Sequence, residues 1–228
     1  LLNARLTKKT FKRWKIIKNF ASEILGSIKL SICSNEETVK YLNYFNSENI
    51  KYFGNIKYCS NLQNIYSKKN TRIELDKNNK VWCAISTHPG EEIFCAEVHQ
   101  ILKKSYKNVK TIIVPRHINR IKEIFINLRK MGLKTQIKNE NDNIDENSEI
   151  ILVNYYGSVF KYYENFKQIF IGKSLIKKFE NDGGQNPIDA ARMGCFIFHG
   201  PYVSNFQEIY KYLDAENISN QIDSKNIL

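Results

Sequence analysis

Hydrophobic positions follow two rhythms in the last two thirds of the chain. Short uninterrupted apolar runs are typical of buried strands, and apolar positions with a period near 3.6 residues are typical of amphipathic helices. The predicted strands are 80–86, 109–114, 133–137, 148–153, 168–171 and 195–199. The predicted helices are 91–105, 120–131, 159–166, 187–193 and 206–213. This alternation of strand and helix predicts an α/β fold with a doubly wound parallel sheet.

Residues 3–25 have a helical period and are rich in Lys and Arg. Six apolar residues are predicted to share one face: Leu6, Phe11, Trp14, Ile17, Phe20 and Ile24. The basic remainder has two interpretations, a helix that lies on anionic lipid or an ordinary domain helix with a solvated basic side. A strand at 29–33 and a helix at 35–45 follow, with Ser34 as the predicted N-cap and Glu37 completing a capping box.

Residues 57–79 are polar, with few hydrophobic anchors, and come after a strand-like segment at 49–53. Such a composition is typical of a linker between domains. We therefore predict an N-terminal domain portion at 1–56, a linker at 57–79 and a second domain at 80–228. Because the first residue is Leu and the helical pattern starts near it, we expect the chain to be a fragment.

The formal net charge of the 228 residues is +12. Such a charge favours a phosphate-rich partner, either nucleic acid, an anionic membrane or a phosphorylated lipid. Lysines scattered among Asn and Ile are equally explained by compositional bias. The sequence has no apolar run of eighteen residues and no signal-peptide pattern, so it offers no membrane-spanning segment of its own.

Cysteine and histidine spacing predicts no metal site. The five cysteines form no Cys-x-x-Cys pair and lie mostly in apolar segments, as reduced core residues of a cytosolic protein do. The four histidines lack ligand spacing with cysteines or carboxylates.

The stretch 182–189 reads Asp-Gly-Gly-Gln-Asn-Pro-Ile-Asp. Gly183 and Gly184 permit positive φ and close ligand approach, and Asn186 is suited to cap a helix opened by Pro187. After a predicted strand, this order is typical of a phosphate or nucleotide loop. A helix start after a flexible turn remains the alternative.

Distinctive residues follow the predicted strands, and in an open α/β sheet such loops converge on one ligand-binding edge. Ser86 and Thr87 offer hydroxyls beside a helix N-terminus, and Arg116 offers a guanidinium that can bind phosphate or carboxylate. His117 is suited to a sugar or a phosphate. Glu91 and Glu92 are either general bases or residues that favour the helix dipole. Motifs of hydrolases, Walker loops and zinc proteases do not occur.

Several ordered motifs carry a resemblance to a known family. They are Ile85-Ser86-Thr87-His88-Pro89-Gly90-Glu91-Glu92, Val114-Pro115-Arg116-His117 with Arg120, Gly183-Gly184-Gln185-Asn186-Pro187-Ile188-Asp189, and Gly200-Pro201 with Asn205-Phe206. Together with Asn3-Ala4-Arg5-Leu6 and Gly54-Asn55-Ile56-Lys57, they resemble the 3-deoxy-D-manno-octulosonic acid (Kdo) transferases.

The resemblance implies a glycosyltransferase with two Rossmann-like domains in the GT-B arrangement. It implies transfer of Kdo from CMP-Kdo to a lipid A precursor (lipid IVA) in lipopolysaccharide biosynthesis, with inversion, no metal and no cofactor. The chain would hold the end of the acceptor domain and the donor domain, and lack the general base, so we expect donor binding without turnover. The implied location is the cytoplasmic face of the bacterial inner membrane, peripheral or anchored through missing N-terminal sequence.

Carried over by position, the resemblance implies donor contacts from two groups of residues. The first group is Ser86, Thr87, His88, Arg116 and His117, with Arg116 stabilising the leaving phosphate. The second is Gly157, Ser158, Gly183, Gly184, Asn186 and Asp189, the last beside the ribose. Four residues depart from the family pattern: Ser158 and Asp189 where Glu is usual, Lys173 where Gly is usual, and Gln185 where His is common.

The implied partners are CMP-Kdo, a lipid A precursor and an anionic membrane surface, toward which Lys8, Lys12 and Lys15 would contribute charge. Two alternatives remain open from the sequence. One is another GT-B transferase or an epimerase that uses a UDP-sugar. The other is a basic nucleic-acid-binding protein, against which stands the absence of RRM, KH and helix-turn-helix signatures.

Overall fold

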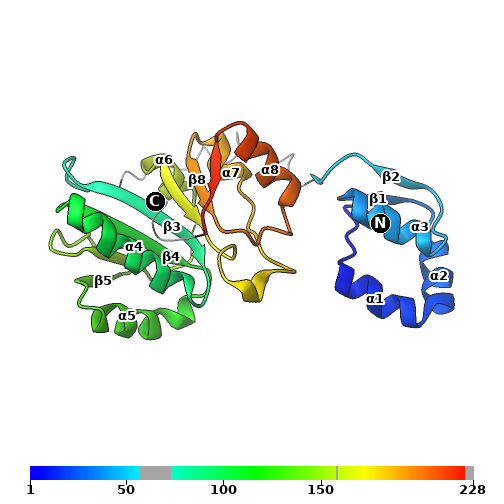
Figure 1. The fold of residues 1–228 in the computed structure, drawn as a ribbon, viewed down its shortest axis with the longest axis horizontal. Helices are drawn as coiled ribbons and strands as arrows, with labels where there is room; N and C mark the ends of the chain where they lie inside the picture. The colour runs from blue at the N-terminus through cyan, green and yellow to red at the C-terminus, as the bar shows by residue number, and fades with distance from the viewer. Residues whose placement is uncertain (57–72, 158, 224–228) are drawn as a thin grey trace. The chain divides into compact units, whose positions relative to one another are not determined.

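The computed structural model describes residues 1–56, 73–157 and 159–223. The chain divides into two compact units, residues 1–69 and residues 70–228 (Figure 1).

The first unit is a small α/β assembly. Its elements in order are α1 (Lys8–Ile16), α2 (Lys18–Gly26), β1 (Ser31–Cys33), α3 (Glu36–Tyr44) and β2 (Ile50–Tyr52). The two strands pair in parallel, with Cys33 opposite Tyr52. The buried core consists of Ala21, Leu25, Cys33, Leu42 and Phe45.

The prediction of one helix over 3–25 is wrong, because the helix breaks at Ile17. The α1 helix begins only at Lys8, where the Thr7 side chain accepts a hydrogen bond from the backbone N–H of Thr10. Ile17 leaves helical geometry, with φ −115° and ψ 48°, and α2 starts in a new rotational register. The predicted apolar face does not continue into α2, where Ala21 and Leu25 are buried instead.

The helix α3 is capped one residue later than the sequence predicts. The Oδ1 of Asn35 accepts a hydrogen bond from the Thr38 N–H at 2.9 Å. The Ser34 hydroxyl instead donates to the Ala4 carbonyl at 3.0 Å, so it ties the start of the chain to the end of β1. Asn and Ser are comparable N-caps, and tertiary contact decides between them.

The second unit is built around a seven-stranded sheet in which every neighbouring pair is parallel. The strand order is β5-β6-β4-β3-β7-β8-β9. The strands are β3 (Lys80–Thr87), β4 (Val109–Pro115), β5 (Thr135–Lys138), β6 (Ile150–Val153), β7 (Gln168–Ile171), β8 (Phe196–His199) and β9 (Ser219–Gln221). The helices are α4 (Glu91–Ser105), α5 (Ile121–Lys130), α6 (Phe160–Asn165), α7 (Ile188–Arg192) and α8 (Gln207–Ala215), with 3₁₀ turns η3 (Ile118–Arg120) and η4 (Lys177–Phe179).

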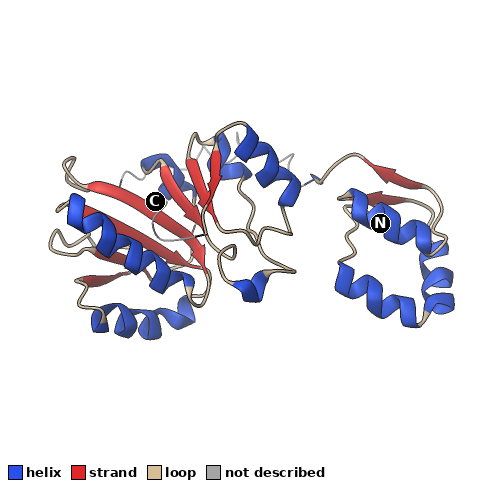
Figure 2. Ribbon diagram, in the orientation of Figure 1, coloured by secondary structure: helices blue, strands red, loops and turns tan. Residues whose placement is uncertain are grey.

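Helices lie on both faces of this sheet (Figure 2). Alternate residues of β3 point to opposite faces, so Trp82 and Ala84 join one core while Cys83 and Ile85 join the other. The first core is completed by α4 and α5, and the second by α6, α7 and α8. This arrangement confirms the predicted doubly wound parallel sheet.

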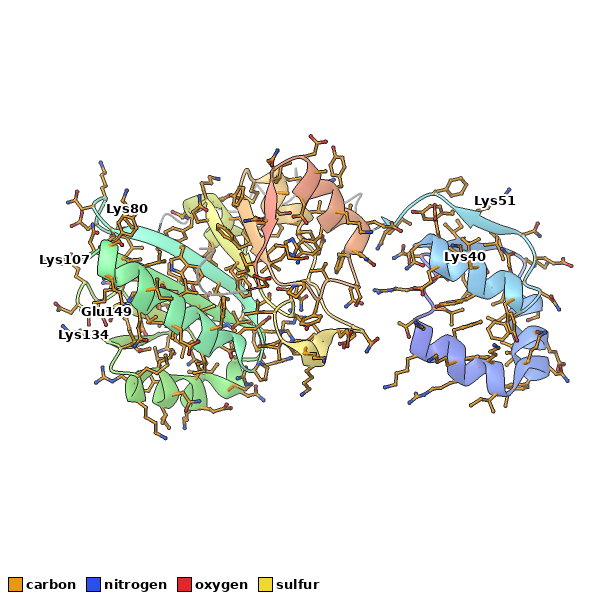
Figure 3. All side chains as sticks on the ribbon, in the orientation of Figure 1. Lys40, Lys51, Lys80, Lys107, Lys134 and Glu149 are labelled. Carbon is orange, nitrogen blue, oxygen red and sulfur yellow. The ribbon has the colours of Figure 1, made fainter. Side chains whose placement is uncertain are left out.

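Exposed lysines lie on the outside of both units, among them Lys40 and Lys51 of the first unit and Lys80, Lys107 and Lys134 of the second (Figure 3). Inside, Cys33, Cys83, Cys95 and Cys195 are buried free thiols, as predicted, and Cys59 lies outside the described residues. Burial raises the pKa of the Cys83 and Cys95 thiols well above the usual range, so these thiols are inert core groups.

Candidate functional site

The strand order places the ends of β3, β4 and β7 side by side. The chain runs from β3 to β4 on one side and returns to β7 on the other, so the direction of winding reverses between β3 and β7. In doubly wound sheets, ligands bind outside the carboxyl ends of the strands at this reversal. We refer to this end of the sheet as the carboxyl edge.

The end of β3 is shaped by a β-bulge at Ser86. The pairing of β3 with β4 shifts between Ile85 and Thr87, and Ser86 takes a left-handed φ of 57°. A non-glycine residue in this region is uncommon and is retained when its surroundings fix it. The bulge sends the Thr87 side chain inward, where it is fully buried.

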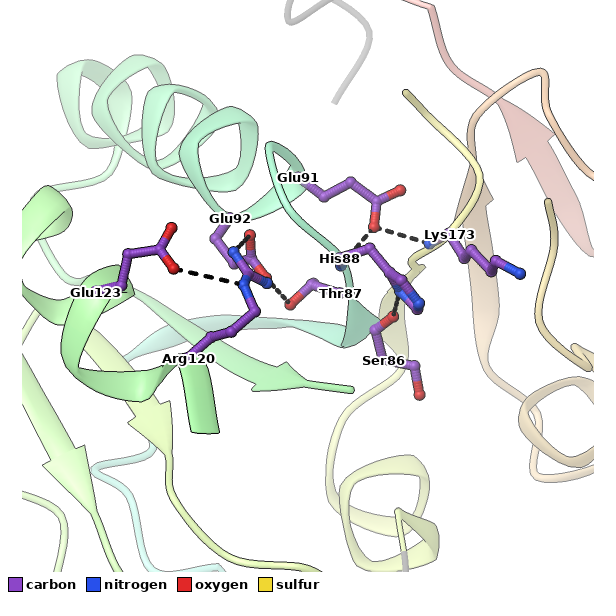
Figure 4. Close-up of polar contacts among 8 residues, drawn as sticks. All are labelled: Ser86, Thr87, His88, Glu91, Glu92, Arg120, Glu123 and Lys173. Carbon is purple, nitrogen blue, oxygen red and sulfur yellow. Dashed lines mark hydrogen bonds and ion pairs between the residues drawn. The ribbon is translucent and has the colours of Figure 1, made fainter. Parts of the chain in front are cut away.

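Glu91 joins the loop after β3 to the loop after β7. Its buried carboxylate accepts hydrogen bonds from four backbone N–H groups. Those of His88, at 2.9 Å, and Lys173, at 2.8 Å, are drawn in Figure 4, and the others are those of Ser174 at 2.9 Å and Leu175 at 3.1 Å. Burial raises the pKa of Glu91, although these N–H groups favour the carboxylate. Glu91 therefore positions the two loops, a role that neither sequence interpretation included.

Glu92, the next residue of α4, is also buried and hydrogen-bonded within the protein. It accepts from the Thr87 hydroxyl at 3.1 Å and from both terminal nitrogens of Arg120, at 2.9 and 3.3 Å (Figure 4). The bidentate pair fixes η3 against α4. The sequence predicts that Thr87 contacts the sugar-nucleotide donor, but its hydroxyl is already hydrogen-bonded within the protein.

His88 is held in one tautomer at the carboxyl edge. Its Nδ1 lies 3.0 Å from the Ser86 carbonyl, which can only accept, so Nδ1 carries the proton and Nε2 faces outward as an acceptor in the neutral ring. The ring packs edge-on against His117 and Phe179, with centroids 5.7 and 5.2 Å away. Burial lowers the pKa of His88, which keeps the ring neutral near pH 7.

Four basic side chains gather around this point: His88, Arg116, His117 and Lys173, which we call the basic cluster. The charges of Lys173, His117 and Arg116 lower the pKa of His88 further, and the His117 ring lies 5.7 Å from the His88 ring. Arg116 is exposed, and its backbone N–H donates to the Thr87 carbonyl at 3.0 Å. An exposed guanidinium and an ammonium beside a neutral imidazole suit an anion that also carries hydroxyl groups.

Lys173 is the member of the basic cluster that the sequence reading did not include. It takes a left-handed φ of 60°, its carbonyl accepts from the Gly184 N–H at 2.7 Å, and its ammonium lies 3.1 Å from the Asp182 carboxylate. The sequence offered one indication of this role, the lysine at a position where the family usually has glycine, because a lysine side chain adds a positive charge there.

The glycine loop packs tightly against its neighbours. A Cβ on Gly183 would lie 2.1 Å from the Tyr202 carbonyl oxygen and 2.6 Å from that of Phe179, so only glycine is accommodated. Gly184 has φ 87°. The Asn205 backbone N–H donates to the Gly183 carbonyl at 2.9 Å, and this bond fixes the loop from the other side.

The N-cap of α7 is Pro187, one residue later than the sequence predicts, and Pro187 already has helical dihedrals. The Oδ1 of Asn186, the predicted cap, accepts a hydrogen bond from the N–H of Ile188, the first residue of the helix, at 3.1 Å. Asp189 lies in the first turn of α7 and is partly buried near Tyr163, whose pKa is raised by burial and by the Asp189 charge.

Gly157 is exposed after β6, which is separated from β3 by β4, and Ser158 lies outside the described residues. No close contact requires glycine at position 157. Lys173 thus connects the loop after β3 to the 182–186 loop, because its backbone N–H donates to Glu91 and its carbonyl accepts from the Gly184 N–H. Among the described residues, a Cβ on Gly157 would meet neither loop within 4 Å.

The loop after β8 contributes a buried histidine and a neighbouring pocket. His199 Nδ1 lies 2.8 Å from the Gly200 carbonyl and Nε2 lies 3.1 Å from the Asp214 carboxylate. Beside it is a pocket of about 340 Å³ between this loop and α8. No group of three or more potential metal ligands occurs in the described part of the chain.

The second unit has a parallel sheet wound in both directions, a glycine loop that opens a helix, and basic side chains at the carboxyl edge. These features define a Rossmann-like domain of the kind found in GT-B glycosyltransferases. Comparison with known proteins gives the family. The family model described as 3-Deoxy-D-manno-octulosonic-acid transferase (kdotransferase) matches residues 1–60. The chain is related to the Kdo transferases, and this relation confirms the resemblance seen in its motifs.

Curated relatives extend the match over the whole chain. The 3-deoxy-D-manno-octulosonic acid transferase of Rickettsia prowazekii is 28% identical over 100% of this chain and 49% of its own length. The probable mitochondrial 3-deoxy-D-manno-octulosonic acid transferase of Arabidopsis thaliana is 30% identical over 95% of this chain and 50% of its own. The chain therefore spans about half the length of the curated relatives it matches.

A solved structure matches the fold. It is the crystal structure of the C-terminal CMP-Kdo binding domain of WaaA from Acinetobacter baumannii, with a TM-score of 0.58 and 25% identity. The match covers 65% of this chain and 76% of that one. The similarity supports the GT-B assignment of the seven-stranded sheet.

Proposed function

We propose that residues 80–228 bind CMP-Kdo and that the chain is part of a Kdo transferase. The main observation behind the proposal is the similarity of this chain to a solved domain described as a CMP-Kdo binding domain. The basic cluster at the carboxyl edge of the sheet supports it. CMP-Kdo carries a phosphate and a carboxylate, and both groups are matched by guanidinium and ammonium donors.

In the proposed reaction, a hydroxyl oxygen of a lipid A precursor attacks the anomeric carbon of Kdo, and the bond from that carbon to the CMP phosphate oxygen breaks. The hydroxyl proton passes to a general base that we place in the half of the relatives not matched by this chain. Arg116 stabilises the phosphate as its negative charge increases. The loop of Gly183, Gly184 and Asn186 lies against the nucleotide, with Asp189 toward the ribose hydroxyls.

The acceptor is proposed to reach the enzyme from the cytoplasmic face of a membrane, with the protein bound peripherally. Among the described residues, none of the helices has the length and apolar character needed to cross a bilayer. No metal or cofactor is included in the proposed reaction, because Arg116 and Lys173 supply the positive charge that the leaving phosphate needs.

The test is calorimetric titration of the chain with CMP and, separately, with UMP. We expect CMP to bind more tightly than UMP. Arg116→Ala and Lys173→Met should each weaken CMP binding by about tenfold or more, because each removes a charge-assisted hydrogen bond. Arg129→Ala and Lys104→Met are matched controls, since Arg129 lies in the last turn of α5 and Lys104 in the last turn of α4, and both should leave the affinity unchanged.

Two results would contradict the proposal. Equal or tighter binding of UMP would indicate a UDP-sugar enzyme of the same fold. Binding of neither nucleotide by a chain that is folded by circular dichroism, combined with steeply salt-dependent binding to random duplex, would indicate a nucleic-acid-binding protein.

A further inference from the structure

Lys173 and Asp182 form an ion pair beside the other members of the basic cluster. The Lys173 ammonium lies 3.1 Å from the Asp182 carboxylate, and the two side chains are 20% and 65% exposed. Among the described residues, neither side chain takes part in a second salt bridge. In Figure 4 the Lys173 side chain extends away from the His88 ring. The charge of Lys173 is therefore engaged by a carboxylate of the protein itself.

Backbone hydrogen bonds fix both residues, and none of these bonds involves the ion pair. The Lys173 N–H donates to the Glu91 carboxylate at 2.8 Å, and its carbonyl accepts from the Gly184 N–H at 2.7 Å. The Asp182 N–H donates to the Phe179 carbonyl at 3.2 Å. Opening the ion pair therefore requires only rotation about side-chain bonds, and both loops keep their positions.

The fixed backbone keeps Lys173 within reach of an anion at the basic cluster. Gly172, the residue before it, packs against the loop after β3, because a Cβ there would lie 2.5 Å from the Ser86 carbonyl oxygen. The same carbonyl holds the His88 ring through Nδ1 at 3.0 Å. Burial is the main cause of the lowered pKa of His88, and among the neighbouring charges that of Lys173 has the largest effect. The four-carbon stem of lysine is flexible, so the ammonium can turn from Asp182 toward such an anion.

The ion pair is weak enough for a ligand to replace one of its partners. The Asp182 carboxylate is largely exposed, and water screens ion pairs at such positions. A phosphate monoester carries up to two negative charges and three terminal oxygens, so it binds an ammonium more strongly than a single carboxylate does. An uncharged nucleoside offers no such group. The pair therefore distinguishes ligands that carry a phosphate from ligands that do not.

We propose that Asp182 is an exchangeable counter-ion of Lys173 and a determinant of phosphate affinity at the basic cluster. In the free protein, the Asp182 carboxylate neutralises the Lys173 ammonium. When CMP binds, its phosphate takes the ammonium, and the carboxylate returns to water. The Asp182 side chain thus competes with the ligand, and removal of its charge strengthens binding. The inference deepens the proposed function and rests on it, because the anion is the phosphate of CMP.

The experiment is calorimetric titration of the 228-residue chain and its Asp182→Asn variant with CMP and, separately, with cytidine. Asparagine keeps the shape of the side chain but removes its charge, so CMP should bind the variant about three- to fivefold more tightly. Cytidine lacks the phosphate, and its affinity should change by less than about 1.5-fold. Circular dichroism checks that the variant is folded.

Asp76→Asn is the matched control. Asp76 is exposed beside the turn before β3, at the opposite end of that strand from the basic cluster. Its side chain accepts from the Asn78 N–H at 2.9 Å, and an asparagine oxygen can accept the same bond. The CMP affinity of this variant should therefore stay within about 1.5-fold of the wild type.

A double-mutant cycle separates the ion pair from a general effect of charge. In a Lys173→Met background, Asp182→Asn should leave the CMP affinity within about 1.5-fold, because no ammonium remains to be released. Tightening by the same factor in both backgrounds would overturn the proposal, since it would show that Asp182 repels the phosphate without acting on Lys173. Weaker CMP binding by Asp182→Asn would also overturn it, because the carboxylate would then hold Lys173 in its binding position.

The wild type separates this inference from the proposed function. If the wild type and Asp182→Asn bind CMP equally, the counter-ion exchange is wrong and the donor site stands. An equal gain for CMP and cytidine would likewise overturn the exchange alone, because cytidine has no phosphate. If neither the wild type nor the variant binds CMP, both proposals are wrong.

Discussion

A buried carboxylate is stable only when hydrogen-bond donors replace the water that it loses, and Glu91 receives four backbone donors. All four come from the two loops that border the point where the sheet reverses its winding. The same loops carry His88 and Lys173, so the geometry of the basic cluster depends on a carboxylate that faces away from solvent. At the residue scale, the site is held together by hydrogen bonds from backbone amides, and such bonds cannot be predicted from residue types alone.

Glu91→Gln should lower the free energy of unfolding by about 2–4 kcal/mol, because the amide nitrogen would face N–H donors and leave them unpaired. Unfolding in urea, followed by Trp82 fluorescence in a Trp14→Phe background, reports the second unit. Glu164→Gln, on the exposed side of α6, is the control and should change stability by less than about 0.5 kcal/mol. A similar small change for Glu91→Gln would show that the four bonds contribute little.

His99 gives the second unit a pH-dependent stability. It is fully buried, its Nδ1 bonds the Thr111 hydroxyl at 2.9 Å and its Nε2 has no partner among the described residues. Burial lowers the pKa of His99 from 6.5 to about 4, with the charge of Glu149 opposing and those of Lys103 and Lys110 assisting. Above pH 6.5 the ring is neutral in both states and stability is complete.

As the pH falls from about 6.5 to about 4, the unfolded chain binds a proton that the folded chain does not. The unit should therefore lose up to about 3 kcal/mol over this window, and no more below it. Urea unfolding at successive pH values, compared with His99→Gln, measures the loss. The variant should show a flatter profile between pH 6.5 and 4, and parallel profiles would exclude His99 as the titrating group.

At the scale of elements, the period of the apolar residues predicted the observed bounds of α4 and β7, and it predicted the bounds of most other elements within two residues. The sheet could be predicted because each strand is buried on both faces and reads as a continuous apolar run. Three features were not predicted for physical reasons. The break at Ile17 leaves no proline or glycine signal, the capping residue of α3 depends on a tertiary bond from Ser34, and β9 is three polar residues paired only at the sheet edge.

The candidate site likewise has features that the sequence predicted and features that it did not. Its residue types and their position after strands could be predicted from the sequence, and so could a helix start beside Asn186, although the N-cap is Pro187. The inward turn of Thr87 depends on the bulge at Ser86, and the reach of Lys173 toward Asp182 depends on a left-handed backbone. Both are conformations that local propensity disfavours, and only the folded surroundings select them.

The glycine loop gives a test at the element scale. Gly183→Ala should displace the loop, because the added Cβ would lie 2.1 Å from a backbone oxygen, and we expect CMP affinity to fall about tenfold or more and stability to fall by about 1–3 kcal/mol. Gly26→Ala, at the end of α2 in the first unit, is the control, since its Cβ would lie 3.8 Å from the nearest atom at an ordinary backbone angle. If Gly183→Ala binds CMP like the wild type, the loop is not part of the donor site.

At the scale of the molecule, the two units carry different chemistry. The second holds the carboxyl edge with its basic cluster. The first holds most of the excess positive charge, because residues 1–69 contain thirteen Lys and Arg against four Asp and Glu. Glu91 and Glu92, at the start of α4, are buried in hydrogen bonds within the protein, so neither is free to accept a proton from an acceptor hydroxyl.

The chain should therefore bind CMP-Kdo without transferring Kdo to a lipid A precursor. The two glutamates nearest the basic cluster are fixed by the backbone and by Arg120, so neither can approach an acceptor hydroxyl without breaking the loops that form the site. The measurement is mass spectrometry of the lipid after incubation with CMP-Kdo, with a full-length Kdo transferase as the positive control. Donor binding by calorimetry with no Kdo on the lipid is the expected result, and Kdo-modified lipid formed by this chain alone would mean that the base lies within these 228 residues.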